Sequence, residues 1–448
     1  MPSQRTSMDR RRVLATLGTV GATLATGAST SAAAQGGNDR SERGRGNWKD
    51  DGDDTESAVL KTGTDRITAT FDRQLEQELH HGAQLAIYHD GEFVVDTAGG
   101  LSDPEGGETT TETRHVLFSC TKPYAAACVH LLAQRGELDY DDRVVEHWPD
   151  YAEEGTRKAK TTIRHVLSHQ AGVPAVEIDG QAHLWSDPDA IAEGMEAAEP
   201  VYEPGTEPNY HTLSFGWLVG EIVRKVSGRR IDRFARDEIF EPLGMDNTSI
   251  GLPEGEEVDV ATLVGFEPYD QITSASSGVQ SGTNQDTADS FNSDFVQQQA
   301  IIPAANGIGT ASDMLRFYAC LLNGGKLEGT RLFTPETIDE WTSLQAETAD
   351  DMSRDVSGRF AMGFFLGGVV QSNLGVTAPP TAFGHAGLGS SVGWADPEND
   401  IAFAYVTNGI RERTEQDFRV GTMADTVRHE LDSRSSHPGR GRAWGRWW

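Results

Sequence analysis

Two pairs of apolar segments, one near each end of the chain, constrain the fold more than any other feature. Near the N-terminus, residues 83–89 and 92–98 flank Asp90-Gly91, a dipeptide that favours tight β-hairpins. Near the C-terminus, residues 391–395 and 401–407 flank a longer acidic turn. Because helical patterns fill the chain between the pairs, we predict an α+β fold. An antiparallel sheet is built from both chain ends, with packed helices and a mainly helical inserted region.

The chain between the hairpins has apolar residues at helical spacing, and several of the periodic segments end at glycine. Residues 268–298 differ, because they are rich in Ser, Gly, Thr, Gln, Asn and Asp and have little apolar periodicity. We expect a long loop there, which is a candidate lid over a site. The expected helices are residues 65–80, 120–135, 163–168, 213–226, 311–323, 335–346 and 414–432.

The two ends of the chain have the character of processing and linker segments. Residues 1–34 resemble a twin-arginine signal peptide, with three consecutive arginines before a weakly apolar run. This predicts passage through the twin-arginine export machinery and a secreted or cell-surface-associated protein. Residues 35–57 are polar and acidic and are expected to be a disordered linker. Residues 58–434 are then the folded domain, and residues 435–448 are an Arg/Trp tail.

The charge balance excludes one class of partner. The chain has 69 Asp and Glu against 38 Lys and Arg, a formal net charge of −31. A field of this sign repels phosphate, so no nucleic acid is expected to bind. Only seven of the basic residues are Lys, a pattern that suggests a surface hydrated in concentrated salt. The three cysteines encode no disulfide framework, and the oligomeric state is left open.

The segment Ser119-Cys120-Thr121-Lys122 carries the clearest chemistry. If a helix begins at Ser119, Lys122 lies one turn later on the same face, so its amine can approach the serine hydroxyl. A buried lysine loses its charge more readily and can then take the proton of a nucleophilic serine. The thiol of Cys120 is expected to point away from that face and to pack in the core.

Further motifs follow in the order expected for one known superfamily. Tyr210-His211-Thr212 stands in a turn bounded by Pro and Gly, and His385-Ala386-Gly387 lies on a strand near the C-terminus. With the Ser-x-x-Lys segment, the chain resembles the serine β-lactamase and penicillin-binding-protein superfamily, in particular the class C β-lactamase-like and family VIII carboxylesterase branch. The resemblance covers about residues 60–432 and implies a β-lactamase-like fold.

The resemblance implies a role for each matching residue. Ser119 is the nucleophile, Lys122 the general base and Tyr210 a general acid and base whose pKa Lys122 lowers. The backbone N–H groups of Ser119 and Leu388 form the oxyanion hole. The implied substrate is a small-molecule ester or amide. No cofactor and no metal are expected. The residues expected to bind substrate are Thr212, His385, Gly387 and Asn306.

Two departures from the family pattern bear on the substrate. Thr212 replaces an amide side chain, and His385 replaces a permanently charged lysine that anchors a β-lactam carboxylate. Both changes favour a carboxylic ester, cleaved through a Ser119 acyl-enzyme. The alternatives are a β-lactamase or D-amino-acid peptidase that uses the same site, and a non-catalytic binding module that retains the fold.

Other histidines have simpler interpretations. His165 and His169 are four residues apart, a spacing seen in metal sites, but no Glu follows His165. We expect both to be structural. His80 and His81 are expected at a solvated helix end.

Overall fold

The computed structural model describes residues 63–253, 255, 258–266, 283–348, 358–369, 373–389 and 391–431. The expected signal peptide, acidic linker and Arg/Trp tail lie outside these residues. The first and last described elements are helices, α1 (Gly63–Glu76) and α12 (Arg413–Leu431). Within the described part of the chain, no helix is both long enough and apolar enough to cross a membrane.

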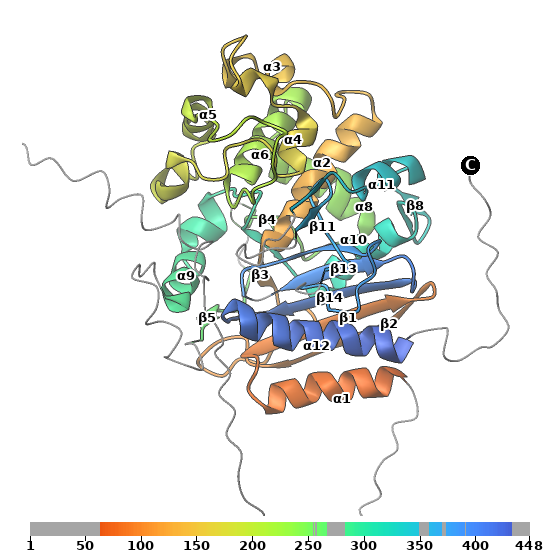
Figure 1. Cartoon of the computed structure of the whole chain (residues 1–448). Helices are drawn as coiled ribbons and strands as arrows, with labels where there is room; N and C mark the ends of the chain where they lie inside the picture. Colours follow the sequence, from red (N-terminus) through yellow and green to blue (C-terminus); the bar gives the residue numbers. More distant parts are fainter. Residues whose placement is uncertain are drawn as a thin grey trace, which may run out of the picture.

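An eight-stranded antiparallel sheet joins the two ends of the chain (Figure 1). Its first strand in sequence, β1 (Gly82–His89), pairs with β14 (Ile401–Thr407), from Ala83 opposite Thr407 to His89 opposite Ile401. The sheet built from both chain ends is therefore confirmed, and so are both hairpins. The strands in spatial order are β2 (Glu92–Gly100), β1, β14, β13 (Val392–Asp396), β12 (Phe383–Ala386), β11 (Phe365–Leu366), β10 (Arg359–Phe360) and β9 (Ala346–Glu347).

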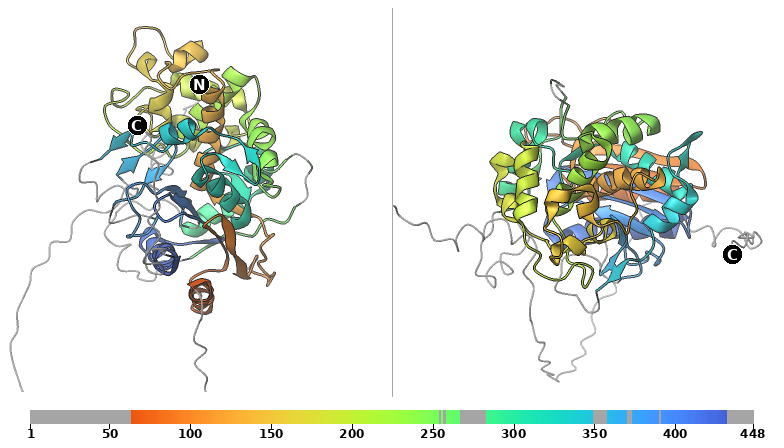
Figure 2. Two further views of the ribbon diagram at one scale, coloured as in Figure 1. Left: turned by 90° about the vertical axis from the view of Figure 1, so that its right-hand side faces the viewer. Right: turned by 90° about the horizontal axis from the view of Figure 1, so that it is seen from above.

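Each face of the sheet is covered by helices. On one face α1 and α12 lie side by side, and both are seen end-on in the left view of Figure 2. Their apolar residues, among them Ile67, Phe71 and Val420, form one core cluster with β1, β13 and β14. The opposite face packs against α2 (Lys122–Gln134) and α10 (Ala311–Leu322), and the helical region lies beyond them (Figure 1).

Helix α2 is central because it is apolar nearly all round, and a helix of that kind requires partners on every side. All its residues from Lys122 to Leu132 are buried. Pro123 lies in its first turn, where the missing N–H removes no helical hydrogen bond. The first turn of α2, which follows Ser119, is thereby held in the interior between the sheet and the helical region.

The helical region follows the sequence pattern with two corrections. The expected helix over 335–346 ends at Trp341, because residues 346 and 347 pair with β10 as strand β9. The expected loop over 268–298 is wrong for residues 284–291 and 295–298, which are helical, and residues 268–282 lie outside the described residues. The candidate lid role stays a prediction. The remaining helices are α3 (Val144–His147), α4 (Ile163–Leu167), α5 (Pro188–Ala197), α6 (Ser214–Ser227), α7 (Ile231–Ala235), α8 (Glu241–Leu243), α9 (Asn284–Phe291) and α11 (Pro335–Trp341).

Short elements complete the fold. A three-stranded sheet lies beside the turn at Ser119–Thr121, with β6 between β3 and β4. The further strands and short helical turns are β3 (His115–Phe118), β4 (Ser249–Ile250), β5 (Val264–Gly265), β6 (Gly307–Gly309), β7 (Lys326–Leu327), β8 (Thr330–Arg331), β15 (Gly409–Ile410), the 3-10 turns Ser119–Thr121, Pro149–Tyr151, Lys158–Lys160, Glu177–Gly180 and Ala182–Leu184, and the π-helical turns Arg236–Phe240 and Phe295–Gln299.

Candidate active site

Ser119 lies on a tight turn between β3 and α2. Phe118, which ends β3, has a φ of 47° and a ψ of −132°, a left-handed conformation that costs about 1–3 kcal/mol in a residue other than glycine. The next turn holds this backbone in place. Thr121 Oγ1 donates to the Phe118 carbonyl at 2.5 Å and accepts from the Gly307 N–H of β6 at 2.8 Å. This supporting role of Thr121 was not predicted, because its partner lies 186 residues away in the sequence.

Lys122 lies where the Ser-x-x-Lys spacing predicts it. Its Nζ is 3.0 Å from Ser119 Oγ and donates to the Ala304 carbonyl at 3.1 Å. The lysine side chain is fully buried, and this burial lowers its pKa from 10.5 to about 7. A large fraction of the amine is therefore neutral at neutral pH, with a lone pair that can accept a proton. This arrangement can activate a serine without a histidine.

Tyr210 lies against the same pair of residues. Lys122 Nζ is 4.8 Å from the centre of the Tyr210 ring, and the Tyr210 hydroxyl shares a hydrogen bond with the Ser119 side chain. The expectation that Lys122 lowers the pKa of Tyr210 is wrong: burial raises this pKa above its usual value of 10. Desolvation of the phenolate is the largest cause, and it outweighs the hydrogen bond with Ser119, which lowers the pKa. Tyr210 therefore keeps its proton at neutral pH.

Two buried histidines hold the segment that carries Tyr210. The His211 N–H donates to His169 Nδ1 at 3.0 Å, and the His211 ring accepts from the Val173 N–H at 3.1 Å. The His169 ring packs on Phe215 and against Tyr210. His169 is thus structural, as expected. His165 is structural too, since its Nδ1 accepts from the Thr162 N–H in a capping box of α4. The support of Tyr210 by His169 and His211 was not predicted.

The end of strand β12 approaches the serine turn closely. A Cβ on Gly387 would lie 2.5 Å from the Leu117 carbonyl, so only glycine permits this approach. Cys120 Sγ donates to the carbonyl of His385 at 3.3 Å and of Ser391 at 3.5 Å, which confirms its packing role. Leu388 follows Gly387 and is 37% exposed. Its expected part in an oxyanion hole with Ser119 stays a prediction.

His385 is buried and neutral. Its Nδ1 lies 2.8 Å from the Ala386 carbonyl, so Nδ1 carries the ring proton and Nε2 presents a lone pair. Within the described residues, Nε2 has no hydrogen-bond partner. The ring packs between Phe365 and Tyr210. Burial, with a smaller contribution from Lys122, lowers the pKa of His385 to about 3.

The other two expected substrate contacts have different positions. Asn306 is corrected to a structural role, because its side chain accepts from the Ile302 N–H and donates to the Val296 and Ala300 carbonyls. No donor of its amide is left for a substrate. Thr212 is exposed just before α6, and no hydrogen bond joins its hydroxyl to another described residue. Its contact with substrate stays a prediction.

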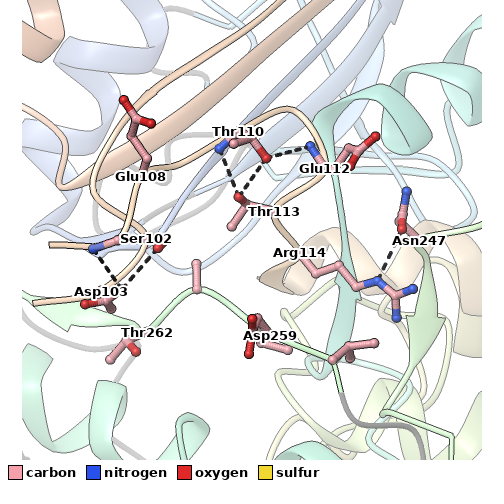
Figure 3. Close-up of a pocket in the computed structure, with 14 residues that line it drawn as sticks. Ser102, Asp103, Glu108, Thr110, Glu112, Thr113, Arg114, Asn247, Asp259 and Thr262 are labelled. Carbon is pink, nitrogen blue, oxygen red and sulfur yellow. Dashed lines mark hydrogen bonds between the residues drawn. The ribbon is translucent and has the colours of Figure 1, made fainter. Parts of the chain in front are cut away.

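No group of three or more His, Cys, Asp or Glu side chains in the described ranges could hold a metal ion. A cavity of about 720 Å³ lies between the β2–β3 connection and residues 258–262, and Ser102, Asp103, Arg114 and Asn247 are among its lining residues (Figure 3). None of Ser119, Lys122, Tyr210 and His385 lines it. This cavity is therefore separate from the group of residues around the serine.

Comparisons with known proteins show the family to which the chain belongs. A family model described as Beta-lactamase matches residues 67–426. Esterase/beta-lactamase LipL of Mycobacterium tuberculosis is 33% identical over 344 residues, which cover 73% of this chain and 77% of that protein. The crystal structure of a family VIII carboxylesterase has a TM-score of 0.68 and 28% identity, covering 83% of this chain and 99% of the other. A penicillin-binding protein homologue from Caulobacter crescentus has a TM-score of 0.66 and 29% identity, with the same two coverages. The chain therefore belongs to the beta-lactamase family of serine hydrolases.

Proposed function

We propose that this serine hydrolase cleaves small carboxylic esters through an acyl-enzyme on Ser119. The observation that carries the proposal is the buried contact of 3.0 Å between Lys122 Nζ and Ser119 Oγ, made by an amine whose pKa is about 7. A base with a pKa near the working pH combines a substantial neutral fraction with a useful driving force for proton transfer.

The side chains support a two-step reaction. Lys122 takes the proton of Ser119 Oγ as the oxygen attacks the ester carbonyl, and the N–H groups of Ser119 and Leu388 hydrogen-bond the resulting oxyanion. Tyr210, which keeps its proton at neutral pH, donates it to the leaving alkoxide and regains a proton from the Lys122 ammonium. Water then attacks the acyl-enzyme in the reverse sense, and Ser119 recovers its proton.

The state of His385 favours an ester over a β-lactam. A histidine with a pKa of about 3 has no charge at neutral pH and cannot anchor a carboxylate as a lysine does. The similarity to a family VIII carboxylesterase supports the same preference, whereas LipL is named both an esterase and a beta-lactamase. Cleavage of a β-lactam or of a D-amino-acid peptide is the alternative, since the same acyl-enzyme serves amides.

The test compares turnover of p-nitrophenyl acetate and butyrate with that of nitrocefin and a D-Ala-D-Ala peptide, in high-salt buffer. Wild type should cleave the esters and give little turnover of the other two. Ser119→Ala should abolish ester turnover and labelling by a fluorophosphonate. Ser227→Ala removes a hydroxyl whose hydrogen bonds go to the backbone of Val223 and Arg229 at the end of α6, and it should leave both unchanged. Dominant nitrocefin or peptide turnover would overturn the ester assignment, and full activity of Ser119→Ala would overturn the nucleophile.

We also propose export by the twin-arginine machinery, from the Arg-rich segment at residues 10–12. Replacement of Arg10, Arg11 and Arg12 by Lys should retain the protein inside the producing cells. Unchanged appearance of the variant in the medium would reject this route.

A further inference from the structure

A buried arginine of α12 contacts the loop that follows β12. The Arg419 side chain is 1% exposed, and all five of its N–H donors are engaged. It donates to the Gly389 carbonyl at 2.5 Å and to the Gly409 carbonyl at 2.8 Å. The remaining donors bind the Leu79 carbonyl at 2.9 Å, Gln416 Oε1 at 2.9 Å and His80 Nδ1 at 3.2 Å.

His80 belongs to this network, and the expectation that it lies at a solvated helix end is wrong. It is 4% exposed. Because the guanidinium can only donate, His80 Nδ1 must be an acceptor, and Nε2 carries the proton toward Gln74 and Tyr405. The Gln74 amide in turn donates to the Arg419 carbonyl at 2.9 Å. Residues of α1 and β14 therefore belong to the hydrogen-bond network that orients the Arg419 side chain.

The carbonyl that Arg419 holds belongs to the segment just after Leu388. Gly389 has a φ of 55°, and its carbonyl also accepts from the Arg411 N–H at 2.9 Å. A Cβ at Gly389 would lie 2.3 Å from the Arg411 carbonyl. Two residues earlier, the Gly387 N–H donates to the Ser391 carbonyl at 2.7 Å. The short segment from Gly387 to Gly389 is therefore held at both of its ends.

The chemistry of the arginine argues for more than stability. None of its five hydrogen bonds goes to a carboxylate, so every hydrogen-bond partner of this buried cation is a carbonyl or a neutral side chain. Apolar residues of similar volume commonly stabilise a core as well as buried charges do, because they avoid the desolvation of the charge. Burial lowers the pKa of Arg419 to about 9, so the guanidinium keeps its charge at neutral pH. A fixed guanidinium with planar geometry orients a carbonyl more closely than an apolar contact can.

We propose that Arg419 is a positioning residue for the oxyanion hole: by holding the Gly389 carbonyl, it orients the Leu388 N–H toward the carbonyl that Ser119 attacks. This inference rests on the proposed acyl-enzyme function. It predicts that loss of the Arg419 guanidinium lowers kcat more than it raises KM, because an oxyanion contact is strongest in the transition state.

The test is a pair of matched substitutions on α12. Arg419→Lys keeps the positive charge and loses the planar guanidinium with its five N–H donors. Arg428→Lys makes the same change at a second buried arginine, which donates to Asp396 Oδ2 at 2.7 Å and to the Leu374 carbonyl, away from the Ser119 turn. Measured per mole of fluorophosphonate-titrated enzyme, Arg419→Lys should lower kcat for p-nitrophenyl butyrate about 10- to 100-fold with KM within about 3-fold of wild type. Arg428→Lys should keep kcat within about 2-fold even if both variants lose the same thermal stability.

A kcat of Arg419→Lys within 2-fold of wild type, or an equal loss in both variants, would overturn the positioning role. If Arg419→Lys does not fold, Gln416→Met removes the acceptor of Arg419 Nε and should still lower kcat several-fold without raising KM. An unchanged kcat in that variant would also overturn the inference. Failure of the proposed function is distinguishable, because the wild type itself would then not turn over the ester.

Discussion

Replacing Lys122 by Met should inactivate the enzyme and stabilise its fold. Burial lowers the pKa of Lys122 from 10.5 to about 7, which corresponds to a destabilisation of about 5 kcal/mol at pH 7 or below. The substitution also removes hydrogen bonds to Ser119 and Ala304, which offset the gain by about 1–3 kcal/mol. Lys122→Met should therefore raise the free energy of unfolding at pH 7 by about 2–4 kcal/mol.

The stability difference between wild type and Lys122→Met depends on pH, and the direction follows from the lowered pKa of Lys122. The folded pKa lies below the unfolded value, so the unfolded chain binds more protons between about pH 7 and pH 10.5. In that interval the wild type becomes more stable as the pH rises, and the advantage of Lys122→Met shrinks by about 1.4 kcal/mol per pH unit. Below pH 7 both states hold the proton and the advantage is constant.

The assay is urea unfolding of both proteins at pH 7.5 and pH 9.5, with ester turnover measured beside it. Lys158→Met is the matched control, because Lys158 is also buried, with a pKa lowered to about 8, but bonds the Met195 and Glu196 carbonyls. The control should keep full activity. An equal advantage of Lys122→Met at both pH values would refute a buried amine with a lowered pKa, and retained activity would refute its role as the base.

Three further substitutions test other parts of the site. Gly387→Ala places a methyl group 2.5 Å from the Leu117 carbonyl, so kcat in ester hydrolysis should fall about 10- to 100-fold; a wild-type rate would mean that the β12 end tolerates displacement. Asn306→Ala leaves three buried backbone groups unpaired and should lower the free energy of unfolding by about 2–4 kcal/mol, with KM unchanged. A raised KM would mean that Asn306 contacts the substrate after all. His385→Lys should raise the ratio of nitrocefin to ester turnover, and a constant ratio would count against the substrate argument.

The parts of the structure that the sequence predicted are those that local periodicity determines. Both hairpins and α2 follow from patterns within about ten residues, and the Ser119–Lys122 contact follows from one helical turn. Helix α9 was missed because it is polar, although Thr283 and Asp286 form a capping box that the sequence carries. That signal was available and would have divided the expected loop.

The missed features depend on contacts between distant segments. His80 is buried by α12, some 340 residues later, and Asn306 is engaged by the turn around residues 296–302. The pKa of Tyr210 was assigned the wrong direction because the sequence shows a neighbouring lysine and does not show burial. Burial acts on both groups at once: it raises the pKa of the phenol and lowers that of the amine that was expected to oppose it.

Surface and site together favour an uncharged substrate. The chain has a net charge of −31, and such a field lowers the local concentration of anions such as β-lactams with a free carboxylate. At the serine, burial lowers the pKa values of Lys122, His169 and His385, so above pH 7 these groups are mainly neutral. A carboxylate would then meet long-range repulsion without a fixed positive charge to receive it. The substrate preference should therefore persist in concentrated salt, because screening removes the repulsion and leaves the neutral site unchanged.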